Sequence, residues 1–275
     1  MKIPRILIII TLLLPLIKCY SEINSKTSLV INNYEIESNQ IPEAFYNYKI
    51  LFLSDFHINN LLPKKYFLEV IRKIEEIRPD LILFGGDLTD ENTDDFRFVS
   101  QIIERLKMFD FASVSGNHDN LNGKYNLIKQ FDDMGIPVLE NQAVSINKGN
   151  SQIFIAGISD YNTSTIDKSK AISNIPEKSF LILLSHSPEP YHQVKNNTSI
   201  DLMLSGHTHG GQVTLFGLFA PILPLSNRKY WKGTYHSHFN KLIITNGIGV
   251  YRFSLRFFAP PGIELITLKG SSEET

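Results

Sequence analysis

The chain has 275 residues, of which 43% are hydrophobic and 20% are charged, and its formal net charge is −1. These values are typical of a globular protein and exclude a disordered or fibrous chain. A net charge close to zero gives no reason to expect a polyanion held by bulk electrostatics, so no nucleic-acid partner is predicted. The length allows one large domain or two small ones, each with a sizeable core.

The N-terminal segment differs from the rest of the chain. Basic residues precede an uncharged apolar run from Ile6 to Ile17. This order is typical of a secretory signal, and the run is shorter than the ~20 residues that cross a bilayer comfortably. We expect residues 1–21 to be a signal peptide or an N-terminal membrane anchor, with lipidation at Cys19 as a further alternative. Residues 22–275 are expected to form the folded domain.

That domain contains no cysteine, because Cys19 is the only one in the chain. It therefore has no disulfide, no thiolate metal ligand and no cysteine nucleophile. A metal site in it must use His, Asp, Asn or Glu side chains.

Apolar runs and helical patterns alternate through the first half of the domain. A polar segment at 28–38 predicts a hairpin about Asn32-Asn33. The pattern then predicts strands at 49–54, 81–85 and 111–115, and helices from Pro63 to before Pro79, over 96–109 and from about 124 to 134. Strands separated by helices indicate right-handed crossovers and a largely parallel sheet.

The second half has strands at closer spacing. They are predicted at 143–147, 152–157, 180–185, 200–205, 241–245 and 263–268. We therefore predict an α/β fold of one domain, a two-sheet β-sandwich of mixed sheets flanked by helices.

Polar side chains follow five of these strands at the point where each ends. The groups are Asp55-Phe56-His57, Gly86-Asp87, Gly116-Asn117-His118-Asp119, His186, and Gly206-His207-Thr208-His209. Each alone has a simpler explanation, since Asp87 is good chemistry for capping a helix and a lone histidine is usually a loop residue. Together they indicate a metal site, because open α/β sheets bind ligands at the carboxyl ends of their strands and clustered polar groups need cations to offset their burial.

This series of motifs resembles the calcineurin-like metallophosphoesterase family from about residue 27 to residue 268. The last motif, GHTHGGQ, and the Arg-rich segment RFSLRFFAPP at Arg252 to Pro261 look most like a subgroup of small bacterial phosphodiesterases. The resemblance implies the αββα fold and assigns the ligands of two divalent metals. Asp55, His57 and His209 would hold the first, Asn117, His186 and His207 the second, and Asp87 would bridge both.

The family's mechanism would follow from these ligands. Two cations ~3.5–4 Å apart lower the pKa of a bridging water, and the resulting hydroxide would attack phosphorus. His118 would be the general acid that protonates the leaving oxygen, with Asp119 orienting its ring. Oxygen and nitrogen ligands without sulfur suit Mn²⁺, which we expect, with Fe or Zn²⁺ as alternatives. The Asp-Arg-Gly extension of protein serine/threonine phosphatases is missing after Asp87, which argues against a phosphoprotein substrate.

The segment next to the last motif bears on the substrate. Val213 to Leu225 carries no charge, and basic and aromatic residues follow it. This pattern is typical of a membrane-surface contact, and an ordinary strand and loop packed on the domain is the alternative. We predict hydrolysis of a phosphodiester or pyrophosphate, belonging to a lipid or envelope component. Arg252 and Arg256 are candidates for binding the substrate phosphate, with a structural salt bridge as the alternative for each.

Other functions remain to be distinguished. One is the splitting of UDP-2,3-diacylglucosamine in lipid A synthesis, which requires an uncleaved anchor and an active site on the cytoplasmic face of the inner membrane. A cleaved signal would favour an enzyme exported to the periplasm or cell envelope. A non-catalytic metal-binding scaffold belongs to another class, and such proteins typically lose ligands that this chain keeps. A nuclease lacks support, since there is no basic stripe.

Overall fold

The computed structural model describes residues 29–91, 93–121 and 127–271. The predicted signal or anchor at 1–21 lies outside these residues. Within the described ranges, no helix is both long enough and apolar enough to cross a membrane.

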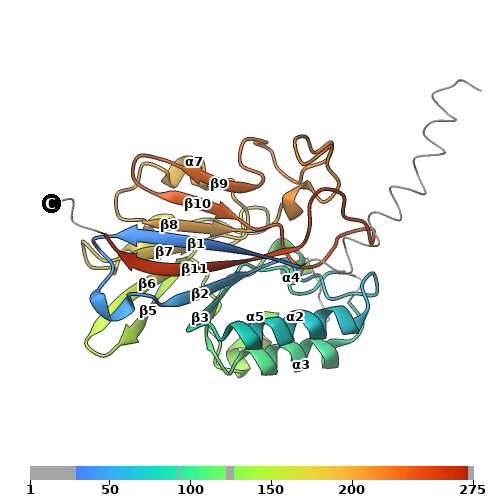
Figure 1. The fold of residues 1–275 in the computed structure, drawn as a ribbon, viewed down its shortest axis with the longest axis horizontal. Helices are drawn as coiled ribbons and strands as arrows, with labels where there is room; N and C mark the ends of the chain where they lie inside the picture. The colour runs from blue at the N-terminus through green and yellow to red at the C-terminus, as the bar shows by residue number, and fades with distance from the viewer. Residues whose placement is uncertain (1–28, 92, 122–126, 272–275) are drawn as a thin grey trace, which may run out of the picture.

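Two mixed sheets form the centre of the domain (Figure 1). In the first, the described strands run in the order β1 (Val30–Ser38), β11 (Gly262–Gly270), β2 (Lys49–Leu53), β3 (Leu81–Phe84) and β4 (Asp110–Ser113). Strands β2, β3 and β4 are parallel to one another, and β11 is antiparallel to β2. The carboxyl ends of β2, β3 and β4 therefore meet at one edge.

The second sheet has the same kind of edge. Its order is β5 (Gln142–Lys148), β6 (Ser151–Gly157), β7 (Leu181–Leu184), β8 (Leu202–Ser205), β10 (Lys241–Ile244) and β9 (Gly233–His236). Strands β6, β7, β8 and β10 are parallel, and the two edge strands pair antiparallel. Each sheet thus has a central set of parallel strands, and the two sheets pack face to face, as the predicted sandwich requires.

Helices cover the outer face of each sheet. The first sheet is covered by α2 (Lys64–Ile77), α3 (Phe96–Leu106) and α5 (Leu127–Asp133), and the second by α6 (Lys168–Ile172) and α7 (Tyr191–Val194). Short elements complete the order: η1 (Glu43–Phe45), α4 (Asn117–Leu121) and η2 (His209–Gly211). The resulting layers are helix, sheet, sheet, helix, which confirms the predicted fold class.

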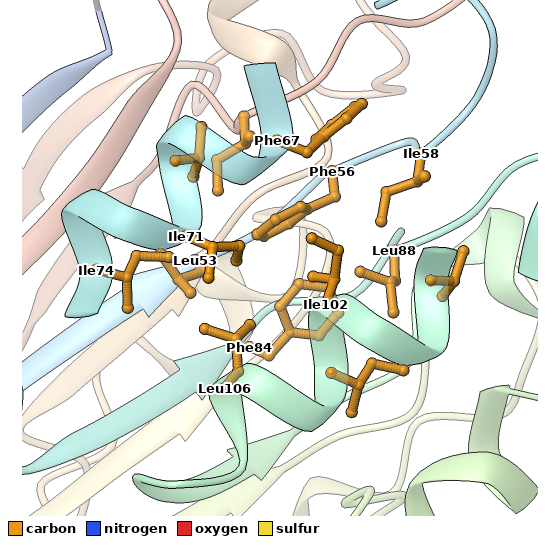
Figure 2. Close-up of a cluster of buried hydrophobic side chains, with 14 of the residues drawn as sticks. Leu53, Phe56, Ile58, Phe67, Ile71, Ile74, Phe84, Leu88, Ile102 and Leu106 are labelled. Carbon is orange, nitrogen blue, oxygen red and sulfur yellow. The ribbon is translucent and has the colours of Figure 1, made fainter. Parts of the chain in front are cut away.

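Strand alternation divides the core between these layers. Leu53 and Phe84 point toward the helices and pack with Phe67 and Ile102 (Figure 2). Their neighbours Phe52 and Leu83 point the other way, into the interface between the sheets. Because both faces are buried, the central strands read as continuous apolar runs, which is why the sequence predicts them well.

The ends of α2 and α3 follow from local sequence. Helix α2 begins after Pro63, and it ends where Arg78 adopts a left-handed conformation (φ 50°) ahead of Pro79. The side chain of Asp95 caps α3 by accepting the backbone N–H of Phe98. These signals explain why both helices match their predicted ranges closely.

The hairpin predicted about Asn32-Asn33 is wrong. Residues Val30–Ser38 form one continuous strand, β1, whose partner is β11, more than two hundred residues away in the sequence. An Asn-Asn pair favours a turn only through local interactions. The parallel pairing with β11 instead provides backbone partners along the whole length of β1. Strand β9 is an edge strand with exposed or half-buried residues, and the apolar pattern did not reveal it.

Candidate metal centre

The strand-end residues of both sheets converge. Asp55 and His57 follow β2, Asp87 follows β3, Asn117 follows β4, His186 follows β7, and His207 and His209 follow β8. The backbone N–H of His207 donates to the Asp55 carboxylate, with N–O distances of 3.1 and 3.0 Å, and so links the two sheets. The structure thus brings together all seven of the predicted ligand residues.

The backbone at these positions is unusual. Five of the seven residues have the positive φ values that L-residues rarely adopt: Asp55, His57, Asp87, His207 and His209. Glycines allow the close approach of the loops, since a Cβ on Gly116 would lie 2.1 Å from Asp87 Oδ1, and one on Gly206 would lie 2.2 Å from Asp55 Oδ2. Such strained positions persist only where surrounding structure holds them, and they concentrate at functional sites.

One buried group consists of Asp55, His57 and His209. The Nε2 atoms of the two histidines are 3.1 Å apart. Asp55 Oδ1 lies 3.6 Å from His209 Nε2 and 4.0 Å from His57 Nε2. Metal–ligand bonds of about 2.0–2.2 Å place neighbouring ligand atoms roughly 3–3.5 Å apart, so this group fits a single cation.

The other buried group consists of Asp87, His186 and His207. His207 Nδ1 lies 3.1 Å from His186 Nε2, and Asn117 Oδ1 lies 3.2 Å from the same Nε2. Asn117 therefore adds a neutral oxygen to this group, as the sequence predicts.

Asp87 stands between the two groups. Its Oδ2 atom lies 3.2 Å from His186 Nε2 and 3.5 Å from His57 Nε2. Its Oδ1 atom accepts the backbone N–H of His118 at 2.9 Å, which fixes the carboxylate. One carboxylate oxygen therefore faces both groups, the geometry that a bridging ligand needs.

Hydrogen bonds outside the groups set the histidine tautomers. His186 Nδ1 donates to the carbonyl of Gly85 at 2.7 Å, and His207 Nε2 donates to that of Pro224 at 2.9 Å. The opposite ring nitrogen of each histidine then presents a lone pair to the centre. Imidazoles oriented in this way are the usual state of metal ligands, so the residues fit the two cations that the motifs imply.

The pKa shifts point to the same need for positive charge. Burial acts to lower the pKa of His186, but Asp87 and other nearby carboxylates raise it to about 10. His209 shows the reverse: burial, His57 and Arg256 hold its pKa well below the usual range, in the neutral form that binds metals. A buried cluster with excess negative charge must take up protons or cations, and divalent metals meet that need.

Asp119 lies elsewhere than the sequence analysis expects. Its carboxylate accepts the backbone N–H groups of Asp87, Leu88, Thr89 and Gly116, at 2.7 to 3.3 Å. Burial and the Asp87 charge raise the pKa of Asp119 to about 7. Its hydrogen bonds tie the loop after β3 to the loop after β4, and the contact to the His118 ring comes from another residue.

That residue is Glu91. Its Oε2 lies 3.0 Å from His118 Nδ1, and its Oε1 accepts the Tyr251 hydroxyl at 3.3 Å. The Tyr251 ring lies 4.5 Å from the His118 ring and 5.5 Å from the His57 ring, between centroids. Neither residue belongs to a strand-end motif, and only their closeness in sequence to Asp87 and Arg252 could have suggested them.

The two predicted phosphate-binding arginines have different roles. Arg256 is 1% exposed, and its guanidinium donates to the carbonyls of His209, Asn246, Gly247, Gly249 and Ala259. It cannot meet a substrate, so that prediction is wrong; the alternative of a salt bridge is also replaced, by hydrogen bonds to carbonyls. Arg252 is exposed and lies over the Tyr251 ring at 5.2 Å.

The family follows from comparison with known proteins. The model of the calcineurin-like phosphoesterase family matches residues 48–211, which include all seven residues of the metal centre. The chain belongs to this family. It is accordingly a metal-dependent phosphoester hydrolase, with two candidate metal sites.

Relatives that match most of this chain also have phosphoesterase names. The chain is 33% identical over 249 residues to the metallophosphoesterase YkuE of Bacillus subtilis, covering 87% of this chain and 85% of that one. It is 31% identical to the phosphodiesterase YaeI of Escherichia coli, covering 80% and 82%. A zebrafish transmembrane protein with a metallophosphoesterase domain is 27% identical, and the match covers 91% of this chain but only 60% of that longer protein.

The contrast between the two arginines can be tested. Arg256→Gln should lower the free energy of unfolding by about 3 kcal/mol, because buried carbonyls lose a charged donor. Arg252→Gln is the matched control and should change it by no more than about 0.5 kcal/mol, since its side chain is in solvent. Urea unfolding of both variants measures this, and equal stability of the two would refute the structural role of Arg256.

Proposed function

We propose that this protein is a two-metal phosphodiesterase. The observation that carries the proposal is that Asp87 Oδ2 faces an imidazole of each group, His57 on one side and His186 on the other. In this proposal Asp55, His57 and His209 bind one metal, Asn117, His186 and His207 bind the other, and Asp87 binds both. Mn²⁺ is the proposed metal, because the donors are oxygen and nitrogen without sulfur.

Each part of the centre has a chemical task. Two divalent cations, when bound, would activate water for attack on phosphorus and neutralise the charge on the phosphoryl oxygens. The imidazoles and carboxylates would hold the two cations in position. Hydrogen bonds to the carbonyls of Gly85 and Pro224 set the tautomers of His186 and His207. The chain needs no nucleophile of its own.

His118 is the proposed general acid. It lies beside the group of Asp55, His57 and His209, and the centroid of its ring is 5.1 Å from that of the His57 ring. His118 is 8% exposed. Glu91 accepts Nδ1–H and so orients the ring with Nε2 available to a leaving oxygen. Asp119, the predicted partner of His118, supports catalysis in a different way, by holding the loop that carries Asp87.

The proposed substrate is a phosphodiester or pyrophosphate of a lipid or another envelope component. Large apolar side chains in the segment that follows His209 in the chain are exposed, among them Phe216, Leu218 and Ile222, and this supports it. Arg252, exposed next to Tyr251, is the proposed contact for a substrate phosphate. The basic and apolar N-terminal sequence favours a membrane-associated or exported protein. The zebrafish relative's description as a transmembrane protein supports the membrane-associated choice.

Replacing the bridging carboxylate tests the proposal. The purified chain with Mn²⁺ should hydrolyse bis-p-nitrophenyl phosphate, and Asp87→Asn should lower kcat/KM at least 10³-fold, because both cations lose a ligand. His192→Ala, an exposed histidine outside the centre, is the matched control and should keep full activity.

Other outcomes distinguish the alternatives. A chain that binds Mn²⁺ tightly and hydrolyses none of bis-p-nitrophenyl phosphate, p-nitrophenyl phosphate or UDP-2,3-diacylglucosamine would be a metal-binding scaffold. Preferred cleavage of UDP-2,3-diacylglucosamine would make it the lipid A pyrophosphatase. Faster hydrolysis of the monoester than of the diester would contradict the phosphodiesterase assignment.

The role of His118 predicts a dependence on the leaving group. His118→Gln should lower kcat about 10²-fold or more on a diester with an alkoxide leaving group, which needs a proton, and much less with p-nitrophenolate, which does not. Glu91→Gln should give a smaller change with the same preference. Steady-state rates on the two substrates provide the ratio, and equal losses on both would show that His118 acts otherwise.

A further inference from the structure

Exposed apolar side chains concentrate in one short stretch, residues 215–222, which we call the apolar loop. Leu218, Ile222 and Phe216 are 82%, 74% and 68% exposed, and Leu215 and Phe219 are more than half exposed. Elsewhere in the described chain, most large exposed apolar residues stand far apart, for example Tyr46, Leu68, Met108 and Tyr161. Single exposed apolar residues are ordinary, but a contiguous group marks a surface that binds something.

The loop is held in place, so its exposure is built into the fold. Leu215 and Phe219 pair through the backbone, with an N–O distance of 2.8 Å, and Leu218 N–H donates to the Leu215 carbonyl at 2.9 Å. Lys232 donates to the carbonyl of Gly217, and Arg228 to that of Ala220. These contacts fix the loop backbone in a conformation that leaves the apolar side chains exposed. The alternative of an ordinary strand and loop packed on the domain therefore does not hold for the exposed side chains of Leu215, Phe216, Leu218, Phe219 and Ile222.

The same segment is attached to the metal centre. The Pro224 carbonyl accepts His207 Nε2–H at 2.9 Å, and this bond turns Nδ1 toward His186. Just beyond it, the buried Glu189 carboxylate accepts the backbone N–H groups of Ser226 and Asn227 at 2.8 and 3.1 Å. Whatever the apolar loop contacts is thereby held at a fixed distance from the proposed catalytic site.

Charge indicates what that contact is. From Val213 to Lys232 there is no Asp or Glu, whereas Arg228, Lys229 and Lys232 are basic. The Arg228 guanidinium lies 5.9 Å from the Phe219 ring, and Lys232 Nζ lies 4.8 Å from the Trp231 ring. Apolar tips with a rim of cations and aromatic rings match the boundary between acyl chains and anionic headgroups. Binding to a protein partner does not in general require a rim whose charged residues are all positive.

We propose that the apolar loop inserts into the surface of an anionic lipid bilayer and holds the metal centre at the level of the phosphoesters there. This proposal rests on the proposed phosphodiesterase function for its purpose. Its physical content, bilayer insertion through this loop, stands on the exposure and charge of the loop alone.

The single tryptophan of the chain, Trp231, lies at the rim of the loop and reports on it. The full-length protein is mixed with vesicles of phosphatidylcholine and phosphatidylglycerol in which part of the lipid is brominated. We expect brominated lipid to quench Trp231 emission. Leu218→Asp combined with Phe219→Asp should lower the apparent vesicle affinity at least tenfold, because each buries a charge among acyl chains. Met108 lies just beyond the end of α3 and is 71% exposed, so Met108→Asp is the matched control and should bind as the wild type does.

The comparison separates this proposal from the proposed function. The double variant should hydrolyse soluble bis-p-nitrophenyl phosphate at the wild-type rate but lose at least tenfold in rate on a phosphodiester presented in anionic vesicles. If the wild type hydrolyses neither substrate while loop-dependent quenching remains, the phosphodiesterase assignment fails and the docking surface stands. Leu218→Ser, a milder change, should weaken binding in the same direction and guards against misfolding of the double variant.

Several results would overturn the docking proposal. One is equal Trp231 quenching in the wild type and the double variant, which would mean that another part of the chain binds the lipid. Equal binding to vesicles of phosphatidylcholine alone would contradict an anionic surface. A wild-type dimer that binds no vesicles and dissociates in the double variant would make the loop an interface between two copies of the chain.

Discussion

The structure depends on the placement of a single buried carboxylate between imidazoles that come from two different sheets. Asp87 follows β3 in the first sheet, and one of its oxygens lies 3.2 Å from a nitrogen of His186, which follows β7 in the second. In water such a cluster would disperse, and in the protein interior it persists because counter-charge offsets the cost of burial. The proposed metals would therefore join the two halves of the domain as well as provide its chemistry.

Backbone hydrogen bonds from outside the ligand set hold this arrangement. The Asp119 carboxylate accepts backbone N–H groups from the loops after β3 and β4 and so joins them. The buried Arg256 guanidinium donates to backbone carbonyls, among them those of His209 and Ala259. Each fills a position where loops with left-handed residues would otherwise leave polar groups without partners. The charged residues nearest the centre thus have two separate roles. Asp119 and Arg256 hold the loops, whereas Asp55 and Asp87 are proposed metal ligands.

The sequence predicts the fold and the convergence of the candidate ligand residues well, and the supporting contacts poorly. Strands such as β3 and β8 are buried on both faces, so they read as plain apolar runs, and the residues after them can be located by counting. The pairing of β1 with β11 is not predictable in this way, because it joins segments from opposite ends of the chain. The burial of Arg256 and the contact of Glu91 with His118 depend on how loops fold in space, and an arginine in a loop sequence looks the same whether it binds phosphate or backbone carbonyls.

The metal centre and the apolar loop are connected through the bond from His207 to Pro224, which relates the tautomer of a proposed ligand to the position of a surface loop. All of this depends on two cations sharing Asp87. Anomalous X-ray scattering from crystals grown with Mn²⁺ tests that claim most directly. We expect two anomalous peaks ~3.5–4 Å apart, one beside His57 and one beside His186, with the Asp87 carboxylate between them. A single peak, or two peaks that do not share Asp87, would contradict the account.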